Sequence, residues 1–190
     1  MVAILLGEGF EEMEAMVPCD LLRRAGIPVQ LVGLDGSIVT GSHGIRVCAD
    51  TTIGQLSLDE LELLMLPGGL GGVASIRGCE AALHAIANVW EQGKYLAAIC
   101  AAPTVLAELG IVGDRKATCY PGMEKEMGNA QMQEKAPVVA DGKLLTGAAA
   151  GTAIDFGLML VRALRGSECA QKVSEGIYYP LAQPERSLYD

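Results

Sequence analysis

The sequence predicts one α/β domain, a three-layer α/β/α sandwich built around a mostly parallel sheet. Short apolar runs alternate with amphipathic segments, and no internal repeat or low-complexity linker divides the 190 residues. With 51% hydrophobic residues the chain can bury one sizeable core. We therefore treat residues 1–190 as a single domain.

The first half of the chain begins with a strand–helix–strand unit. The run VAILL precedes an amphipathic helix from about Glu12 to Ala25, and the apolar run PVQLVGL follows it. Residues 37–49 predict a small hairpin, and LELLMLP predicts a buried strand ending at Pro67. A glycine-rich loop, GGLGG, follows directly.

The second half continues the alternation. Residues 79–92 predict a helix, YLAAIC a strand, and APTVLAEL a helix with Pro103 in its first turn. A short strand near KATCY precedes a second hairpin, PVVADGKLLT, which turns at Asp141-Gly142. A long helix is predicted from about Thr152 to Leu164. Ligands of such a sheet bind beyond the carboxyl ends of its strands.

Charge and composition narrow the range of partners. A net charge of −9 opposes binding to nucleic acid or to an anionic membrane surface, so a small molecule or a protein is the expected partner. The N-terminal MVAILLGEGF has no basic n-region and reaches Glu8 early, so it does not resemble a signal peptide. The most membrane-like stretch, residues 95–112, is interrupted by Pro103, Glu108 and Gly110.

The six cysteines predict free thiols. They are far apart, include no CxxC pair, and belong to a chain that needs no disulfide to fold. We therefore expect a reducing compartment, and the cytoplasm is the simplest assignment.

Cys100 is the strongest candidate for chemistry. It ends the apolar run YLAAIC, and Ala98, Ala101 and Ala102 around it are small enough for a sharp strand-to-helix turn. N–H groups at the start of the next helix favour negative charge, which predicts a lowered thiol pKa. A buried, inert cysteine is the alternative, and these residues alone leave both open.

Acidic residues gather where the first strand leads into the first helix. Any of Glu8, Glu11, Glu12 and Glu14 could stabilise the helix start through its dipole. A carboxyl buried beside a thiolate would instead have a raised pKa and could shuttle a proton. The pattern does not say which glutamate would do so.

The glycine-rich loop offers backbone N–H groups that could approach a ligand, as an oxyanion hole requires, although a turn without a ligand fits as well. Residues 69–74 match GxGxxA, but the loop follows a middle strand and lacks the acid expected about 20 residues later, which disfavours dinucleotide binding. His43 and His84 have no metal-ligand spacing with cysteine or aspartate, so no metal is expected.

Four segments, GEGFEEMEA, LMLPGGLGG, LAAICAAPTVLAELG and TGAAAGTAIDFGL, resemble in order and spacing the ThiJ/PfpI superfamily and, within it, the branch of Parkinson-linked protein deglycases (DJ-one). The resemblance runs from about residue 2 to 175, and AAICAAPTVL is its most specific part. It implies a flavodoxin-like domain, related to the class I glutamine amidotransferases. It also implies a homodimer, with the first helix and the hairpin of residues 41–48 near the interface.

The resemblance also implies roles for individual residues. Cys100 matches the family's nucleophile, and Glu14 matches a protonated glutamate that hydrogen-bonds the sulfur. The family's oxyanion-type backbone donors fall on Gly69 and Ala101. Gly68 and Tyr120 would belong to the same pocket.

Two segments depart from the family pattern. Many relatives carry a histidine in a THP-like segment, where this chain has Tyr120, a poor base near neutral pH because the unperturbed tyrosine pKa is about 10. A loop often written RGPGT reads AAAGT at residues 148–152, which removes an arginine and a proline.

By resemblance, the expected activity is that of a cofactor-free glyoxalase III or protein deglycase, in which Cys100 adds to methylglyoxal, glyoxal or their adducts without glutathione. Redox sensing or chaperoning through an oxidisable Cys100, without turnover, is the first alternative. Hydrolysis of an ester, amide or peptide by the same nucleophile is the second.

Overall fold

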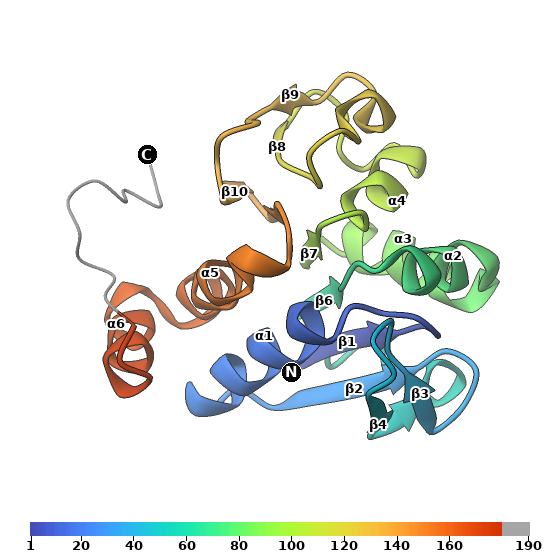
Figure 1. The fold of residues 1–190 in the computed structure, drawn as a ribbon, viewed down its shortest axis with the longest axis horizontal. Coiled ribbons are helices and arrows are strands. Elements are labelled where there is room, and N and C mark those ends of the chain that lie inside the picture. The colour runs from blue at the N-terminus through green and yellow to red at the C-terminus, as the bar shows by residue number, and fades with distance from the viewer. Residues whose placement is uncertain (180–190) are drawn as a thin grey trace.

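A seven-stranded, mostly parallel sheet forms the centre of the structure, a computed structural model that describes residues 1–179 (Figure 1). The strand order is β10-β11-β7-β6-β1-β2-β5, and only β10 runs antiparallel to its neighbour. These strands are β1 (Val2–Leu6), β2 (Val29–Gly33), β5 (Thr51–Thr52), β6 (Leu63–Leu66), β7 (Tyr95–Ile99), β10 (Val138–Asp141) and β11 (Leu144–Gly147).

Helices cover both faces of this sheet, which confirms the predicted three-layer sandwich. In Figure 1, α5 and α6 lie at the left of the view and α2 and α3 at the right. The helices are α1 (Glu12–Arg24), α2 (Leu70–Gly78), α3 (Glu80–Glu91), α4 (Pro103–Glu108), α5 (Ala153–Arg165) and α6 (Ser167–Gly176). Short 3₁₀ turns occur at Ile53–Gln55, Glu124–Met127 and Ala150–Thr152.

Alternation along β1 shows how one strand serves two cores. Val2, Ile4 and Leu6 face the cluster that contains α1 and α5, whereas Ala3 and Leu5 face the cluster beneath α2, α3 and α4. Both faces are fully buried, which explains why the strand reads as an unbroken apolar run.

The order of the five parallel strands β2-β1-β6-β7-β11 is the flavodoxin-like order 2-1-3-4-5. In this topology the chain reverses direction across the sheet between β1 and β6, and a crevice opens there beyond the carboxyl ends of the strands. The glycine-rich loop after β6 lies at this crevice, and Cys100 follows β7, the next strand.

Two small strand pairs lie outside the main sheet. The antiparallel pair β3 (Ile38–Thr40) and β4 (Arg46–Cys48) confirms the predicted hairpin. The parallel pair β8 (Lys116–Ala117) and β9 (Gln131–Met132) was predicted only in its first strand. The second predicted hairpin is β10–β11, which extends the main sheet.

Two helices were not predicted. Leu70 begins α2, so only Gly68 and Gly69 of the expected glycine loop remain outside regular structure. The other is α6. No helix within residues 1–179 is both long and apolar enough to cross a membrane.

Candidate active site

Cys100 occupies a strained turn between β7 and α4. Its φ is +65°, in the left-handed region that residues with a Cβ rarely adopt, at a cost of about 1–2 kcal/mol. Its N–H donates to the Gly147 carbonyl at 2.9 Å, and its own carbonyl accepts from the Tyr120 N–H at 2.8 Å. These two hydrogen bonds hold the backbone in the strained conformation, and the side chain is half-buried.

Glu14 lies against Cys100 from the first turn of α1. Its side chain is completely buried, and Oε2 accepts from the Gly68 N–H at 2.8 Å. A hydrogen-bonding contact joins the carboxyl to the Cys100 thiol, whereas Oε1 has no partner within the described residues. Burial raises the pKa of Glu14 to about 7, and the Glu11 carboxylate adds to this effect.

Gly68 allows this close approach because it lacks a side chain. A Cβ there would lie 2.5 Å from Glu14 Oε2 and 2.7 Å from the Cys100 Cβ. Gly69 has a φ of +82°, and a Cβ there would lie 2.4 Å from the Gly9 carbonyl oxygen. The glycines therefore bring the backbone of the β6–α2 connection against the sulfur.

Two backbone N–H groups hydrogen-bond the sulfur, those of Ala101 and Gly69. Both lower the thiol pKa, but burial outweighs them and, with the charge and hydrogen bond of Glu14, raises the pKa of Cys100 to about 12. The sequence-based prediction of a lowered thiol pKa is therefore wrong in this geometry. Desolvation and the Glu14 carboxylate exceed the effect of the N–H groups.

Cys100 and Glu14 together form a coupled acid pair. Burial raises the pKa of both groups, so near neutral pH the pair still holds a proton that the two groups share. A protonated Glu14 no longer adds its charge to the burial that opposes thiolate formation. Movement of this proton from sulfur to carboxyl gives a thiolate next to a neutral acid that can donate the proton again.

The other three N-terminal acids serve the structure. Glu11 caps α1 by accepting from the Glu14 N–H at 2.8 Å, and Glu8 accepts from the Thr40 N–H at 3.1 Å. Glu12 accepts from the His43 N–H at 2.7 Å, and its pKa falls to about 2 because hydrogen bonds from residue 43 outweigh its burial.

The two histidines lie in separate places. The His43 ring contacts Glu12 at 2.9 Å, whereas His84 lies on α3. Glu11, Glu12 and His43 bring potential metal-ligand atoms within 4.8 Å of one another. The carboxylates of both glutamates already accept the hydrogen bonds described above, so we assign no metal to this cluster.

Tyr120 reaches the site through its backbone. Its N–H donates to the Cys100 carbonyl, while the side chain is 48% exposed. Sequence reasoning had considered only the phenol, in comparison with the histidine of relatives.

Sequence reasoning also missed a polar chain behind the turn. Thr104 is fully buried and donates through Oγ1 to the Ala101 carbonyl at 2.7 Å, and Arg77 donates to that same Oγ1 at 2.7 Å. Arg77 is paired with Glu108. The hydroxyl at the fourth position after the cysteine was the available signal, because such side chains commonly bond a carbonyl three residues earlier.

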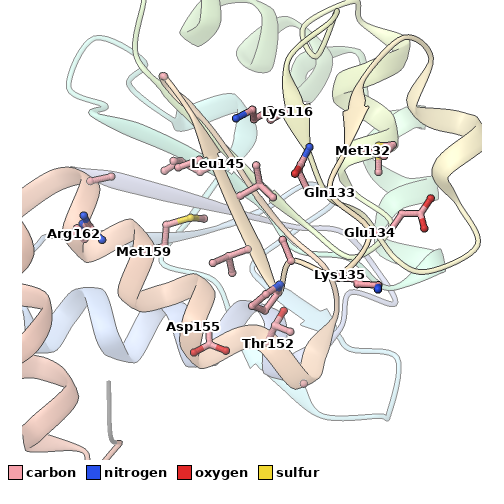
Figure 2. Close-up of a pocket in the computed structure, with 18 of the residues that line it drawn as sticks. Lys116, Met132, Gln133, Glu134, Lys135, Leu145, Thr152, Asp155, Met159 and Arg162 are labelled. Carbon is pink, nitrogen blue, oxygen red and sulfur yellow. The ribbon is translucent and has the colours of Figure 1, made fainter. Parts of the chain in front are cut away.

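A large groove lies beside the β10–β11 hairpin (Figure 2). Its volume is about 1380 Å³, and Asp155, Met159 and Arg162 of α5 line one side while Lys116 and Gln133 lie on another. The hydroxyl of Tyr179 donates to Asp155 at 2.7 Å at its margin. None of the predicted site residues lines this groove.

Fold and site together define an α/β protein with a cysteine on a strained strand-to-helix turn and a buried glutamate beside it. The family model described as "DJ-1/PfpI family" matches residues 1–163, so the chain belongs to the DJ-1/PfpI family. This confirms the resemblance inferred from the sequence.

Known relatives agree with this assignment. Protein dj-1beta of Drosophila melanogaster is 37% identical over 176 residues, which cover 92% of this chain and 94% of that protein. Its crystal structure superposes with a TM-score of 0.90 at 36% identity, covering 94% of this chain and 97% of that one. Deglycase PH1704 of Pyrococcus horikoshii is 33% identical over 142 residues, 74% of this chain and 85% of that protein.

A third relative is a solved structure described as oxidized DJ-1 of Toxoplasma gondii. It is 32% identical and has a TM-score of 0.88, with coverage of 94% of this chain and 97% of that one.

Proposed function

We propose that this protein is a cysteine-dependent enzyme of glyoxalase III or deglycase type that acts on methylglyoxal, glyoxal or their adducts without a cofactor. The observation that carries the proposal is the contact of a half-buried Cys100 with a fully buried Glu14 and with the N–H groups of Gly69 and Ala101. The similarity to a relative named as a deglycase supports the substrate class.

In the proposed reaction the Cys100 thiolate adds to the aldehyde carbon, and the former carbonyl oxygen takes a proton from Glu14. The resulting hemithioacetal loses its C–H proton to the Glu14 carboxylate, which gives an enediolate. Reprotonation at the neighbouring carbon, together with transfer of the hydroxyl proton from the first oxygen to the second, yields a thioester. Water then hydrolyses the thioester to the hydroxy acid and restores the thiol. The product has the composition of the substrate plus one water molecule, so no external oxidant is needed.

Backbone N–H groups would stabilise the oxygen charge that develops during addition. Gly69 and Ala101 supply the backbone N–H groups that act on the sulfur. Removal of one such preorganised donor lowers the rate of an enzyme by about 10²–10³. The AAAGT loop at residues 148–152, without the arginine of relatives, would give this site its own substrate preference.

Cys100→Ala tests the proposal directly. The variant should lose consumption of methylglyoxal, measured by disappearance of the dicarbonyl and appearance of lactate, while Cys48→Ala, at an exposed cysteine of β4, should retain it. Wild-type turnover by Cys100→Ala would refute the mechanism.

A second function, redox sensing without turnover, is favoured by the N–H groups that face the sulfur, because they would also stabilise a sulfinate. The structure of an oxidized relative supports it. Two equivalents of peroxide would oxidise Cys100 through the sulfenate to the sulfinate. Mass spectrometry after mild peroxide treatment tests this, since oxidation confined to Cys19 or Cys169 would exclude it.

We further propose that the chain folds as a single domain, that two copies form a homodimer, and that the protein works in the cytoplasm. Exposed apolar side chains, Met13 on α1 with Ile38 and Ile45 on and beside the β3–β4 hairpin, support the predicted interface. All six cysteines are free, as expected in a reducing compartment.

A further inference from the structure

The two N–H groups that face the sulfur each belong to a peptide link whose carbonyl accepts a hydrogen bond from another segment of the chain. The Ala101 N–H shares its peptide link with the Cys100 carbonyl, which accepts from the Tyr120 N–H at 2.8 Å. The Gly69 N–H shares its link with the Gly68 carbonyl, which accepts from the Glu11 N–H at 3.0 Å. The same arrangement therefore occurs twice.

A hydrogen bond to the carbonyl of a peptide link can orient the N–H of that link. No peptide bond in the described residues is cis, and in a trans peptide the C=O and N–H of one link are coplanar and point in opposite directions. A hydrogen bond that fixes the carbonyl direction therefore also fixes the direction of the N–H. A carbonyl that accepts a hydrogen bond also polarises its link, which strengthens the N–H as a donor.

The Cys100–Ala101 link needs this support because Cys100 is strained. At a φ of +65° the turn would relax by rotating this link, which would carry the Ala101 N–H away from the sulfur. Tyr120 donates from the segment between β8 and the 3₁₀ turn at Glu124–Met127, which is remote in sequence from the turn it holds.

We propose that Tyr120 is a positioning residue that acts through its backbone N–H, which holds the Cys100–Ala101 peptide link so that the Ala101 N–H points at the sulfur. The Glu11 N–H does the same for the Gly68–Gly69 link. This accounts for a site that lacks the histidine of relatives, because any residue at position 120 except proline supplies the N–H. The assignment rests on the proposed function, but it concerns the sulfur rather than the substrate.

The decisive experiment replaces Tyr120 by its α-hydroxy acid, which keeps the side chain and turns the amide into an ester without an N–H. The rate of Cys100 alkylation by iodoacetamide is then measured against pH. At a fixed pH below the thiol pKa we expect alkylation to slow about three- to tenfold, which corresponds to a rise of about 0.5–1 unit in that pKa. Alkylation needs no aldehyde, so this result does not depend on whether methylglyoxal is turned over.

The same replacement at Tyr95 is the matched control. It removes one backbone hydrogen bond, from the Tyr95 N–H to the Glu62 carbonyl at 3.1 Å, at the far end of β7. Its alkylation rate at that pH should match the wild type. An unchanged alkylation rate in the Tyr120 ester, or an equal slowing in Tyr120→Phe, would overturn the proposal.

A measurement on the unmodified protein covers the case in which the ester does not fold. A scalar coupling across the hydrogen bond, between the Tyr120 ¹⁵N and the Cys100 carbonyl ¹³C, should be detectable by NMR. It should weaken when Cys100 is carboxamidomethylated, since the sulfur then no longer gains partial negative charge by sharing its proton with Glu14 and accepts less strongly from the Ala101 N–H. Absence of the coupling, or no change on modification, would refute the assignment.

Discussion

At the scale of single residues, we propose that the buried carboxyl of Glu14 controls the reactivity of Cys100. Ionised, it adds its charge to the burial that already raises the thiol pKa; protonated, it is a donor next to the sulfur. Glutamine at this position keeps an amide donor but removes both the charge and the exchangeable proton.

Glu14→Gln should therefore separate nucleophilicity from proton relay. Alkylation of Cys100 should persist and its midpoint should move to lower pH, because the carboxylate that opposes thiolate formation is gone. Methylglyoxal turnover should fall about 100-fold or more, the usual contribution of a general acid–base group. Tyr120→Phe should reduce turnover much less; normal turnover by Glu14→Gln with an inactive Tyr120→Phe would instead place the relay on the phenol.

The raised pKa of Glu14 also predicts a pH dependence of stability. The folded state holds the carboxyl proton up to about pH 7, whereas the unfolded chain releases it near 4.5, so the free energy of unfolding falls as pH rises between these values. The loss should be about 3 kcal/mol. Urea unfolding at pH 5 and pH 8 should show most of this loss in the wild type and in a surface control, Glu91→Gln, and should show it reduced in Glu14→Gln.

At the scale of elements, the β7–α4 turn stores strain at Cys100. Small alanines flank Cys100, and hydrogen bonds from both sides oppose relaxation of the turn. The left-handed conformation aims the side chain out of the turn, towards Glu14 and the glycines of the β6–α2 connection.

Comparison of Cys100→Gly with Cys100→Ala measures this strain. Glycine adopts a φ of +65° freely, so Cys100→Gly should be the more stable variant by about 1 kcal/mol, although glycine normally destabilises a folded chain. Both variants lack the thiol, so the loss of the Cys100–Glu14 contact cancels. If Cys100→Gly were less stable than Cys100→Ala in thermal or urea unfolding, by the usual cost of glycine, the turn would carry no strain.

Most elements were predictable because their apolar patterns are strong. The helix α2 was not, because the glycines at Gly71, Gly72 and Gly78 disfavour helix in isolation, and burial of Val73 and Ile76 overrides this preference. In α6 most residues are polar, and only Ala170, Val173 and Ser174 are buried.

The site was predictable only in part, for physical reasons. The elbow at Cys100 follows from the strand–alanine–helix pattern, whereas the selection of Glu14 came from the family resemblance. The raised thiol pKa depends on burial by distant segments, and the backbone contact of Tyr120 depends on tertiary structure. Neither feature can be recognised from the sequence around the residue.

At the scale of the whole molecule, apolar side chains on α1 and near the β3–β4 hairpin predict association between copies. Ile45→Glu should convert a dimer at micromolar concentration to a monomer, because a charge would be buried in an interface of about 1,600 Å². Leu109→Glu, at an exposed apolar residue just after α4, should leave the mass unchanged. Light scattering coupled to size exclusion measures both, and a monomeric wild type would contradict the dimer.

The surroundings of Cys100 come from four stretches of chain, residues 11–14, 68–69, 100–101 and 120. None of these lies near another along the sequence, so the sulfur acquires its environment only after long loops have closed, which is a slow event in folding. Before these loops close, Cys100 is an ordinary exposed thiol. Brief pulses of alkylating reagent at successive times during refolding would therefore show when the surroundings of Cys100 assemble, because labelling of this cysteine should change at that time.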